Sequence, residues 1–85
     1  MEYYSVIEVS PLENYCLRLK FENEETKIFD MSQYLDIGLF KKLRNEQEFK
    51  KVRVCFDSIQ WENGLDIDPE ILYEKGKKIE NNKLE

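Results

Sequence analysis

The sequence predicts an α+β fold: an antiparallel β-meander with short helices after its third strand, two further strands and a C-terminal helix packed on the sheet. Alternating apolar and polar residues over 15–21 indicate a half-buried strand. Helix-capping signals recur after residue 30, and Asp-Pro-Glu at 68–70 begins a further helix. The 85 residues suffice for one domain with a small core.

Three strands are predicted in the first 30 residues. Residues 3–9 are rich in β-branched and aromatic side chains, and Ser10-Pro11 should end this strand because proline cannot donate to a ladder. The second strand is expected to present one apolar face, made by Tyr15, Leu17, Leu19 and Phe21. The next four residues form a turn in which Asn23 takes the left-handed conformation, and residues 26–30 return antiparallel.

Three N-cap signals follow the meander. Asp30 resembles the N-cap of a capping box, with Gln33 at N3, and should begin a short helical turn. Asp36 can cap a second short helix. The apolar face of that helix would hold Leu39, Phe40 and Leu43. Asn45 offers a third N-cap, for a single helical turn.

Alternation returns in residues 49–56, which predict a fourth strand. Its apolar face would hold Val52, Val54 and Phe56. Asp57-Ser58 is then a tight turn into a short final strand, in which Ile59 and Trp61 share a face. Trp61 is better explained as core than as an exposed binding aromatic, because so small a domain needs its buried area.

The C-terminal helix is predicted over residues 69–75. Asp68 is its N-cap, and Pro69 occupies the first helical position, where its missing N–H costs nothing. Glu70 complements the helix dipole. Gly76 follows as the C′ residue that ends the helix.

Four acids surround this helix start and raise the alternative of a calcium or magnesium site. They are Glu62, Asp66, Asp68 and Glu70. Their spacing does not match an EF-hand loop, and capping already accounts for two of them, so we disfavour a metal site. Asn63-Gly64 is a turn that permits a positive φ. Asp66 is the least explained of the four acids, and we expect it to hydrogen-bond the backbone of that turn.

The domain is expected to span residues 1–76, with residues 77–85 as a frayed, charged tail that ends in a vector-like Leu84-Glu85. No run approaches the roughly 18 apolar residues of a membrane span, and the N-terminus lacks a basic leader region. We therefore expect a cytoplasmic protein. Cys16 and Cys55 are then free thiols in strands, with a disulfide between neighbouring strands as the less favoured alternative.

The sequence contains no histidine, which removes the commonest general base and the usual partner of a serine or cysteine nucleophile. Two cysteines cannot complete a zinc site without histidine, and no glycine-rich phosphate loop is present. We therefore expect no enzymatic activity, no catalytic residue and no cofactor.

The net charge of −5 is unevenly distributed. Residues 1–40 carry a net −5, residues 41–53 a net +4 and residues 54–85 a net −4. The basic residues of the middle segment are Lys41, Lys42, Arg44, Lys50, Lys51 and Arg53. We interpret them as solvated surface. Contact with an acidic partner or with nucleic acid is the alternative, although the segment lacks aromatics for base stacking apart from Phe49.

The order of these pieces resembles the bacterial domain-of-unknown-function family 2442 over about residues 4–75. The most specific part is the pattern WxNGxDxxPExLY, satisfied by Trp61, Asn63, Gly64, Asp66, Pro69, Glu70, Leu72 and Tyr73. The pattern also includes Asp30, Gly38, Phe40, Leu43 and Phe49. The family commonly has glycine at the hairpin position of Glu24, so a different turn geometry is expected here. The resemblance implies a small α+β domain with no established enzymatic activity.

The expected function is non-catalytic protein binding or regulation. Some members of the resembling family are encoded beside a second small protein, which implies an antitoxin-like pairing. An acidic chain would gain association rate from a small basic partner. Tyr3 and Tyr4 lie on the first predicted strand, where pairing with a second copy and ordinary packing are equally open.

Two further functions remain as alternatives. Residues 41–53 could make this an accessory nucleic-acid-binding domain, although the chain lacks the helix-turn-helix segment that accompanies some relatives. A metal-binding or enzymatic role is the third expectation, and no membrane partner is expected.

Overall fold

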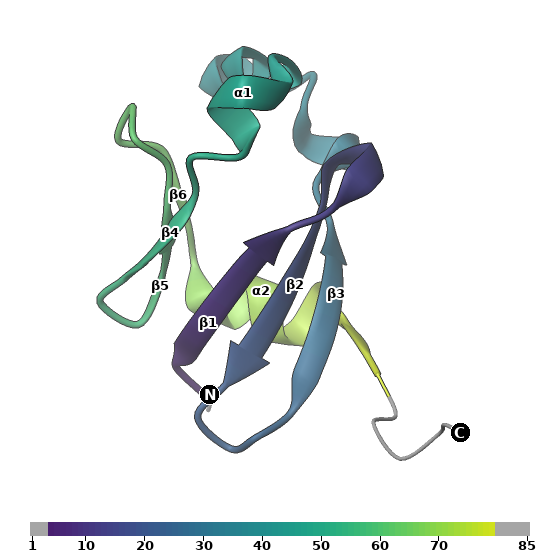
Figure 1. The fold of residues 1–85 in the computed structure, drawn as a ribbon, viewed down its shortest axis with the longest axis vertical. Coiled ribbons are helices and arrows are strands. Elements are labelled where there is room, and N and C mark those ends of the chain that lie inside the picture. The colour runs from purple at the N-terminus through teal and green to yellow at the C-terminus, as the bar shows by residue number, and fades with distance from the viewer. Residues whose placement is uncertain (1–3, 80–85) are drawn as a thin grey trace.

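The computed structural model describes residues 4–79 and contains two antiparallel sheets (Figure 1). The larger sheet has the order β1-β2-β3-β7, formed by Val6–Pro11, Cys16–Phe21, Thr26–Asp30 and Lys77–Lys78. The smaller sheet has the order β4-β5-β6, formed by Arg53–Cys55, Ser58–Gln60 and Asp66–Ile67. The helical elements are η1 (Glu13–Tyr15), η2 (Ser32–Tyr34), η3 (Gly38–Arg44), α1 (Glu46–Phe49) and α2 (Pro69–Lys75). The α+β prediction is confirmed.

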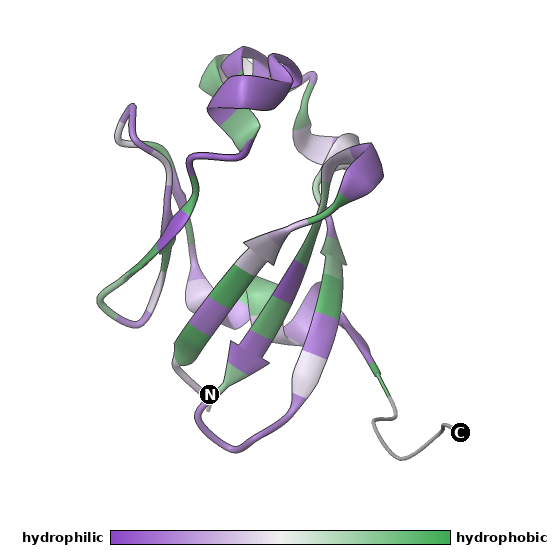
Figure 2. Ribbon diagram, in the orientation of Figure 1, coloured by the Kyte–Doolittle hydropathy of each residue, from purple (hydrophilic) through white to green (hydrophobic). Residues whose placement is uncertain are grey.

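The predicted meander is confirmed, because β2 pairs antiparallel with both β1 and β3. Leu17, Leu19 and Phe21 have no exposed surface, and polar bands alternate with these apolar ones along β2 (Figure 2). Ser10 and Pro11 belong to β1 and pair with β2, so the strand extends beyond its predicted end at residue 9. Proline is tolerated there because β1 is an edge strand whose outward N–H positions need no partner in the sheet.

Tyr15 does not belong to β2, contrary to prediction. It ends η1 with a positive φ of 59°, next to Asn14 with a φ of 60°. This conformation directs the ring to the helical layer, where it lies edge-on to Phe49 at 5.3 Å between centroids. The Tyr15 hydroxyl also donates a hydrogen bond to the carbonyl of Arg44. Tyr15 therefore joins the meander to η3 and α1.

The turn between β2 and β3 forms as predicted, but the left-handed residue is Glu24 rather than Asn23. Glu24 has a φ of 73°. Asn23 contributes through its side chain instead, because its Oδ1 accepts a hydrogen bond from the Glu25 N–H at 3.1 Å. The Asn23 position is thus an Asx turn, and the conformational strain falls on the following glutamate.

Asp30 is not the N-cap residue of η2, which is Met31, but its side chain binds the first residue of that helical turn. Its Oδ1 accepts hydrogen bonds from the N–H and the hydroxyl of Ser32, at 2.9 and 2.6 Å, and these bonds lower the pKa of Asp30. Gln33 does not complete a capping box, since its amide donates to the Asp30 carbonyl at 3.5 Å rather than accepting from a backbone N–H. The predicted Asn45 cap is confirmed, because its Oδ1 accepts from the N–H groups of Gln47 and Glu48.

The second helix differs from prediction in its cap and its period. Asp36 forms an ion pair with Arg44 instead of capping η3, whose N-cap residue is Ile37. The element is a 3₁₀-helix, in which residues three apart share a face. Leu43 is therefore buried and Phe40 partly buried, while Leu39 is 64% exposed.

The predicted strand over residues 49–56 is largely wrong. Phe49 ends α1 with its ring buried, and only Arg53–Cys55 form β4. Since Cys55 pairs with Ser58, the hairpin turn consists of Phe56 and Asp57 rather than Asp57 and Ser58. The strand pairing thus leaves Phe56 in the turn, where it is 96% exposed.

The C-terminal helix spans Pro69–Lys75 as predicted, with the Asp68 carboxylate accepting from the Glu70 N–H at 2.8 Å. Gly76 ends this helix in an extended conformation, not as a left-handed residue. Glycine is required there because a Cβ would lie 2.8 Å from the Leu72 carbonyl oxygen.

The predicted domain boundary after residue 76 is too early. Lys77–Lys78 form β7 and pair with Ile28 and Lys27 of β3. The N–H of Ile79 then donates to the Thr26 carbonyl at 2.9 Å. The rest of the predicted tail, Leu84-Glu85 included, lies outside the described residues.

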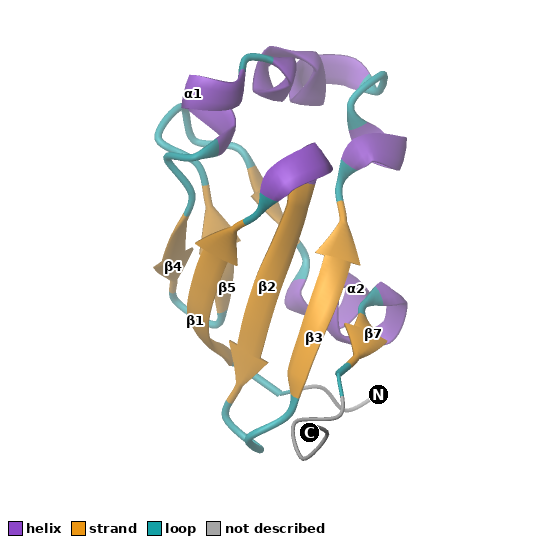
Figure 3. Ribbon diagram, turned by 45° about the vertical axis from the view of Figure 1, so that its right-hand side comes forward, coloured by secondary structure: helices purple, strands orange, loops and turns teal. Residues whose placement is uncertain are grey.

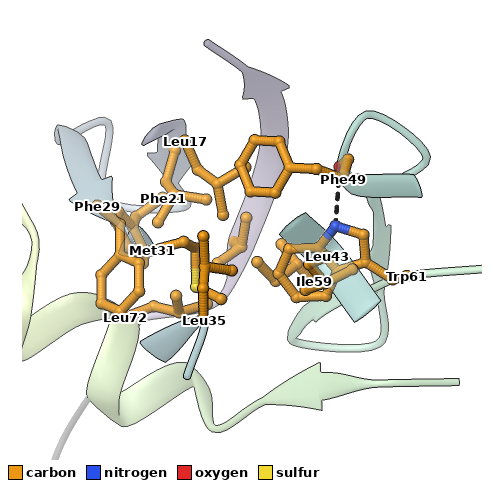
Figure 4. Close-up of a cluster of buried hydrophobic side chains, with 12 residues drawn as sticks. Leu17, Phe21, Phe29, Met31, Leu35, Leu43, Phe49, Ile59, Trp61 and Leu72 are labelled. Atoms are coloured by element: carbon orange, nitrogen blue, oxygen red, sulfur yellow. Dashed lines mark hydrogen bonds between the residues drawn. The ribbon is translucent and has the colours of Figure 1, made fainter. Parts of the chain in front are cut away.

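One hydrophobic cluster joins both sheets, α1, η3 and α2 (Figure 4). Its buried members are Val6, Leu17, Leu19, Phe21, Phe29, Met31, Leu35, Leu43, Phe49, Ile59, Trp61 and Leu72. Trp61 is 1% exposed, and its Nε1–H donates to the Phe49 carbonyl at 2.8 Å. The prediction that Trp61 belongs to the core is confirmed. In Figure 3 the smaller sheet lies beside β1, at the edge of the larger sheet opposite β7.

Candidate functional site

The β4–β5 hairpin holds a phenylalanine in solvent on an unfavourable backbone. Phe56 is 96% exposed and has a φ of 56°. A bulky residue in the left-handed region costs about 1–3 kcal/mol, and such residues cluster at functional sites. The fold therefore maintains an exposed aromatic side chain at a cost in stability.

The other non-glycine residues with a positive φ in the described chain have local explanations. Asn14 is of a type that tolerates the left-handed region. The strain at Tyr15 is offset by its packing on Phe49 and its hydrogen bond. Glu24 completes a tight turn, in which its N–H donates to the Phe21 carbonyl at 2.8 Å. Phe56 is the first residue of a two-residue hairpin turn, a position that takes a positive φ, but its ring lies almost wholly in solvent, so packing does not offset the strain of a bulky residue there.

The hairpin turn is fastened to the larger sheet. The N–H of Val6 donates to the Asp57 carbonyl at 3.0 Å, and the Ser5 hydroxyl donates to Asp57 Oδ1 at 3.0 Å. These bonds join the beginning of β1 to the turn. Phe56 consequently lies in a turn whose other residue, Asp57, is hydrogen-bonded to the larger sheet.

Beside Phe56 lies a surface hollow between the smaller sheet and the start of α2. We define the acidic hollow by six of its lining residues: Phe56, Asp57, Gln60, Asp66, Asp68 and Glu70. Four carboxylates line it and no lysine or arginine does. Arg53 on β4 pairs with Gln60, one of the lining residues on β5. The Arg53 guanidinium donates a hydrogen bond to the Gln60 side chain at 2.9 Å.

The carboxylates of this hollow differ in their engagement. Asp68 caps α2, and Asp57 accepts from Ser5. Asp66 does not hydrogen-bond the preceding turn, contrary to expectation, because Asn63 Oδ1 accepts from the Leu65 N–H at 3.2 Å. Within residues 4–79, neither Asp66 nor Glu70 uses its carboxylate in a hydrogen bond or ion pair. These two groups are available to a ligand.

The predicted turn at Asn63-Gly64 is confirmed, since Gly64 has a φ of 93° and its N–H donates to the Trp61 carbonyl at 2.9 Å. Glu62 lies outside the hollow and pairs with Lys51 at 3.1 Å. In the part of the chain that the structure describes, no three acidic or cysteine side chains converge as metal ligands would.

The six basic residues of segment 41–53 are all exposed but do not act as one set. Arg44 pairs with Asp36, and Arg53 binds Gln60. Lys51 lies 3.1 Å from Glu62 and 3.4 Å from Glu48. The hydrogen bond to Glu62 and the charges of both glutamates raise the pKa of Lys51 above its usual value. The remaining three, Lys41, Lys42 and Lys50, make no ion pair within the described residues.

Tyr4 is 40% exposed, and its ring packs 5.4 Å from that of Tyr73. This contact matches the packing alternative for Tyr4. Tyr3, its predicted companion, lies outside the described residues. Both cysteines are free and lie in strands, as predicted. Burial, and then the charge of Asp30, raise the pKa of the Cys16 thiol, so its reactive thiolate form is disfavoured.

Sequence reasoning missed a polar cluster where α2 meets the larger sheet. The Lys27 ammonium donates to the Tyr73 carbonyl and lies 3.5 Å from the centre of the Tyr73 ring. The Tyr73 hydroxyl donates to Glu25 Oε1 at 2.8 Å and accepts from Asn23 at 3.3 Å. One signal could have revealed this cluster. Lys27 lies opposite the inward-facing Leu19 in the β2–β3 pairing, so its side chain had to point to the same buried face of the sheet.

The titration behaviour of this cluster follows from its contacts. Burial lowers the pKa of Lys27, although the charge of Glu25 opposes this effect. The hydrogen bond from Tyr73 lowers the pKa of Glu25, and the same bond raises the pKa of Tyr73. Since Lys27 is only 9% exposed, the cluster fastens α2 to β3 rather than presenting a lysine to a ligand.

Comparison with known proteins supports the fold but assigns no activity. The family model described as "Protein of unknown function (DUF2442)" matches residues 6–78. The chain belongs to this family. No curated protein and no solved structure matches the chain. The matched region includes Phe56 and the acidic hollow. Since the DUF2442 family has no known function, the role of these features must be argued from their geometry.

Proposed function

We propose that this domain is a non-catalytic protein-binding or regulatory module, and that Phe56 is the anchor of its binding surface. The exposure of Phe56 on a left-handed backbone carries this proposal. Aromatic anchors contribute disproportionately to protein interfaces because a partner pocket removes their large apolar area from water. Binding of Phe56 would recover hydrophobic free energy that the isolated domain forgoes.

The charge of the hollow specifies the chemistry of the partner. Four carboxylates beside Phe56 favour a small basic protein, in which an arginine or lysine contacts Asp66 and Glu70. Such complementarity accelerates encounter and disfavours acidic competitors. An antitoxin-like role toward a small protein encoded by a neighbouring gene fits this chemistry. We propose that the pair acts in the cytoplasm.

The test is affinity capture of the neighbouring gene product, followed by calorimetric titration of the purified pair. Phe56→Ala should weaken the complex at least tenfold, as for a central aromatic anchor. Leu12→Ala is the matched control, because Leu12 is 39% exposed and lies in the β1–β2 connection, away from the hollow. Equal affinity of wild type and Phe56→Ala would exclude Phe56 as the anchor.

The competing nucleic-acid function is tested with the same preparations. Absence of a protein complex, together with salt-sensitive DNA binding that Lys50→Ala/Lys51→Ala/Arg53→Ala abolishes, would replace the protein-binding proposal. Binding that depends on phosphate contacts must weaken as salt rises and must be insensitive to Phe56→Ala, so the two sets of variants separate the two functions.

A further inference from the structure

A second exposed surface has the opposite charge to the acidic hollow. We define the basic surface by four residues of η3 and its N-cap: Ile37, Leu39, Lys41 and Lys42. Ile37 is 55% exposed and Leu39 is 64% exposed. Both lysines are exposed and form no ion pair within residues 4–79. Two large aliphatic side chains thus accompany two available cations.

Local geometry brings two of these side chains together. In a 3₁₀-helix, residues three apart lie on one face, which places Leu39 beside Lys42. Gly38 precedes them with a φ of 51°, and a side chain at this position would meet nothing within 4 Å of its Cβ. The nearby charges of Arg44 and Asp36 neutralise each other. The surface therefore retains the positive charge of its lysines.

The basic surface and the acidic hollow lie in different parts of the molecule. In Figure 1 the η3–α1 layer is at the top, and the β4–β5 turn is at the lower left. The two surfaces of one copy are therefore not in contact. Two copies can bring them together, because each offers exposed apolar side chains next to available charges of opposite sign.

We propose that the basic surface of one copy docks on the acidic hollow of a second copy. Leu39 packs beside Phe56 of the second copy, and the two lysines approach its Asp66 and Glu70. This inference rests on the proposed function, since it uses the same hollow. A second copy and the basic partner therefore compete for Phe56, and self-association shields this ring until the partner displaces it.

The predicted association is weak and electrostatic. A surface built from four residues buries less than the roughly 1,200 Å² typical of stable interfaces. Charge attraction across it is screened within about 8 Å at physiological salt. Sedimentation equilibrium of wild type should therefore show concentration-dependent association at low salt that about 0.5 M salt largely removes.

Charge reversal tests the proposed pairing. Two double variants reverse the charge of one surface each: Lys41→Glu/Lys42→Glu and Asp66→Lys/Glu70→Lys. Each variant should be monomeric alone. An equimolar mixture of the two should associate again. If the second variant fails to fold, Asp66→Lys alone replaces it, because Asp66 is exposed on β6. Arg18→Glu/Lys77→Glu is the matched control, since both residues are exposed on the larger sheet and lie in one cross-strand row with Ile28.

The outcomes are distinct. Wild type that stays monomeric at low salt, a control that loses association equally, or a mixture that fails to associate would each overturn the pairing. Binding of the basic surface to anionic vesicles or DNA in place of a second copy would overturn it too. Lys41→Glu/Lys42→Glu leaves Phe56 and the hollow intact, so it should still capture the basic partner. Wild type that self-associates but captures no basic partner would refute only the proposed function and would leave the pairing of two copies intact.

Discussion

The Lys27 ammonium lies 3.5 Å from the centre of the Tyr73 ring and donates a hydrogen bond to the Tyr73 carbonyl. One side chain of β3 thus binds both the ring and the last turn of α2. The carbonyls of a helix's last turn lack partners within the helix, so a lysine there satisfies one of them. This contact holds α2, whose first residues line the acidic hollow, against the sheet.

Removing this contact should destabilise the domain. Lys27→Ala loses the cation–π contact, the hydrogen bond and the packing of the lysine stem, and should lower the free energy of unfolding by about 1–3 kcal/mol. Urea unfolding measures the change. Lys75→Ala is the control, because Lys75 is exposed at the end of α2. Equal stability of Lys27→Ala and wild type would contradict the proposed role of the contact.

Glu25 should make stability depend on acidic pH. The hydrogen bond from Tyr73 lowers the pKa of Glu25 below 4.5, so the unfolded chain takes up a proton before the folded one. Stability from this group is present above pH 4.5 and is lost as pH falls through the lowered pKa. Glu25→Gln should therefore be less stable than wild type at about pH 6, with the difference shrinking toward about pH 3. Urea unfolding across this range tests the trend, and a constant difference would refute it.

Glu24 should be a site where glycine stabilises the fold. Its φ of 73° costs a non-glycine residue about 1–2 kcal/mol, while glycine adds unfolded-state entropy worth about 0.5–1 kcal/mol. Glu24→Gly should therefore raise the free energy of unfolding by up to about 1 kcal/mol. Glu24→Ala removes the same charge but keeps the strain, and should not stabilise. Thermal unfolding of the two variants separates the contributions, and equal melting temperatures would count against backbone strain.

Trp61 should report on folding and contribute through its indole N–H. Trp61→Phe leaves the buried Phe49 carbonyl without its donor and removes buried apolar area. The expected loss is about 2–4 kcal/mol of unfolding free energy. As the sole tryptophan, Trp61 should show blue-shifted emission that moves to longer wavelength on unfolding. Emission typical of a solvated indole in the folded protein would contradict its burial.

Local signals predicted the segments whose structure depends on their own sequence. Asp68-Pro69 begins α2 at the predicted residue, because a side-chain cap and a fixed φ act within one turn. Strict alternation identified β2, since only one of its faces can enter the core. Asn63-Gly64 was found for the same reason, as glycine permits a φ of 93°.

The candidate site was only partly visible in the sequence. Asp66 was recognised as unexplained, but Phe56 was assigned to the apolar face of a strand. Its exposure follows from the pairing of Cys55 with Ser58, which makes Phe56 a turn residue. A register set by a partner strand cannot be read from alternation within one segment, because a shift of one residue reverses the face of each side chain.

By itself the sequence determined the α+β class, the meander, the Asn45 and Asp68 caps and the C-terminal helix, because short-range hydrogen bonds and side-chain periodicity govern them. Tertiary structure decided the exposure of Phe56 and Leu39, the burial of Lys27 and the pairing of Lys77–Lys78 with β3. These features depend on contacts between segments far apart in the chain. The free energy of such contacts outweighs local preference, since burial of apolar area acts over the whole domain at once.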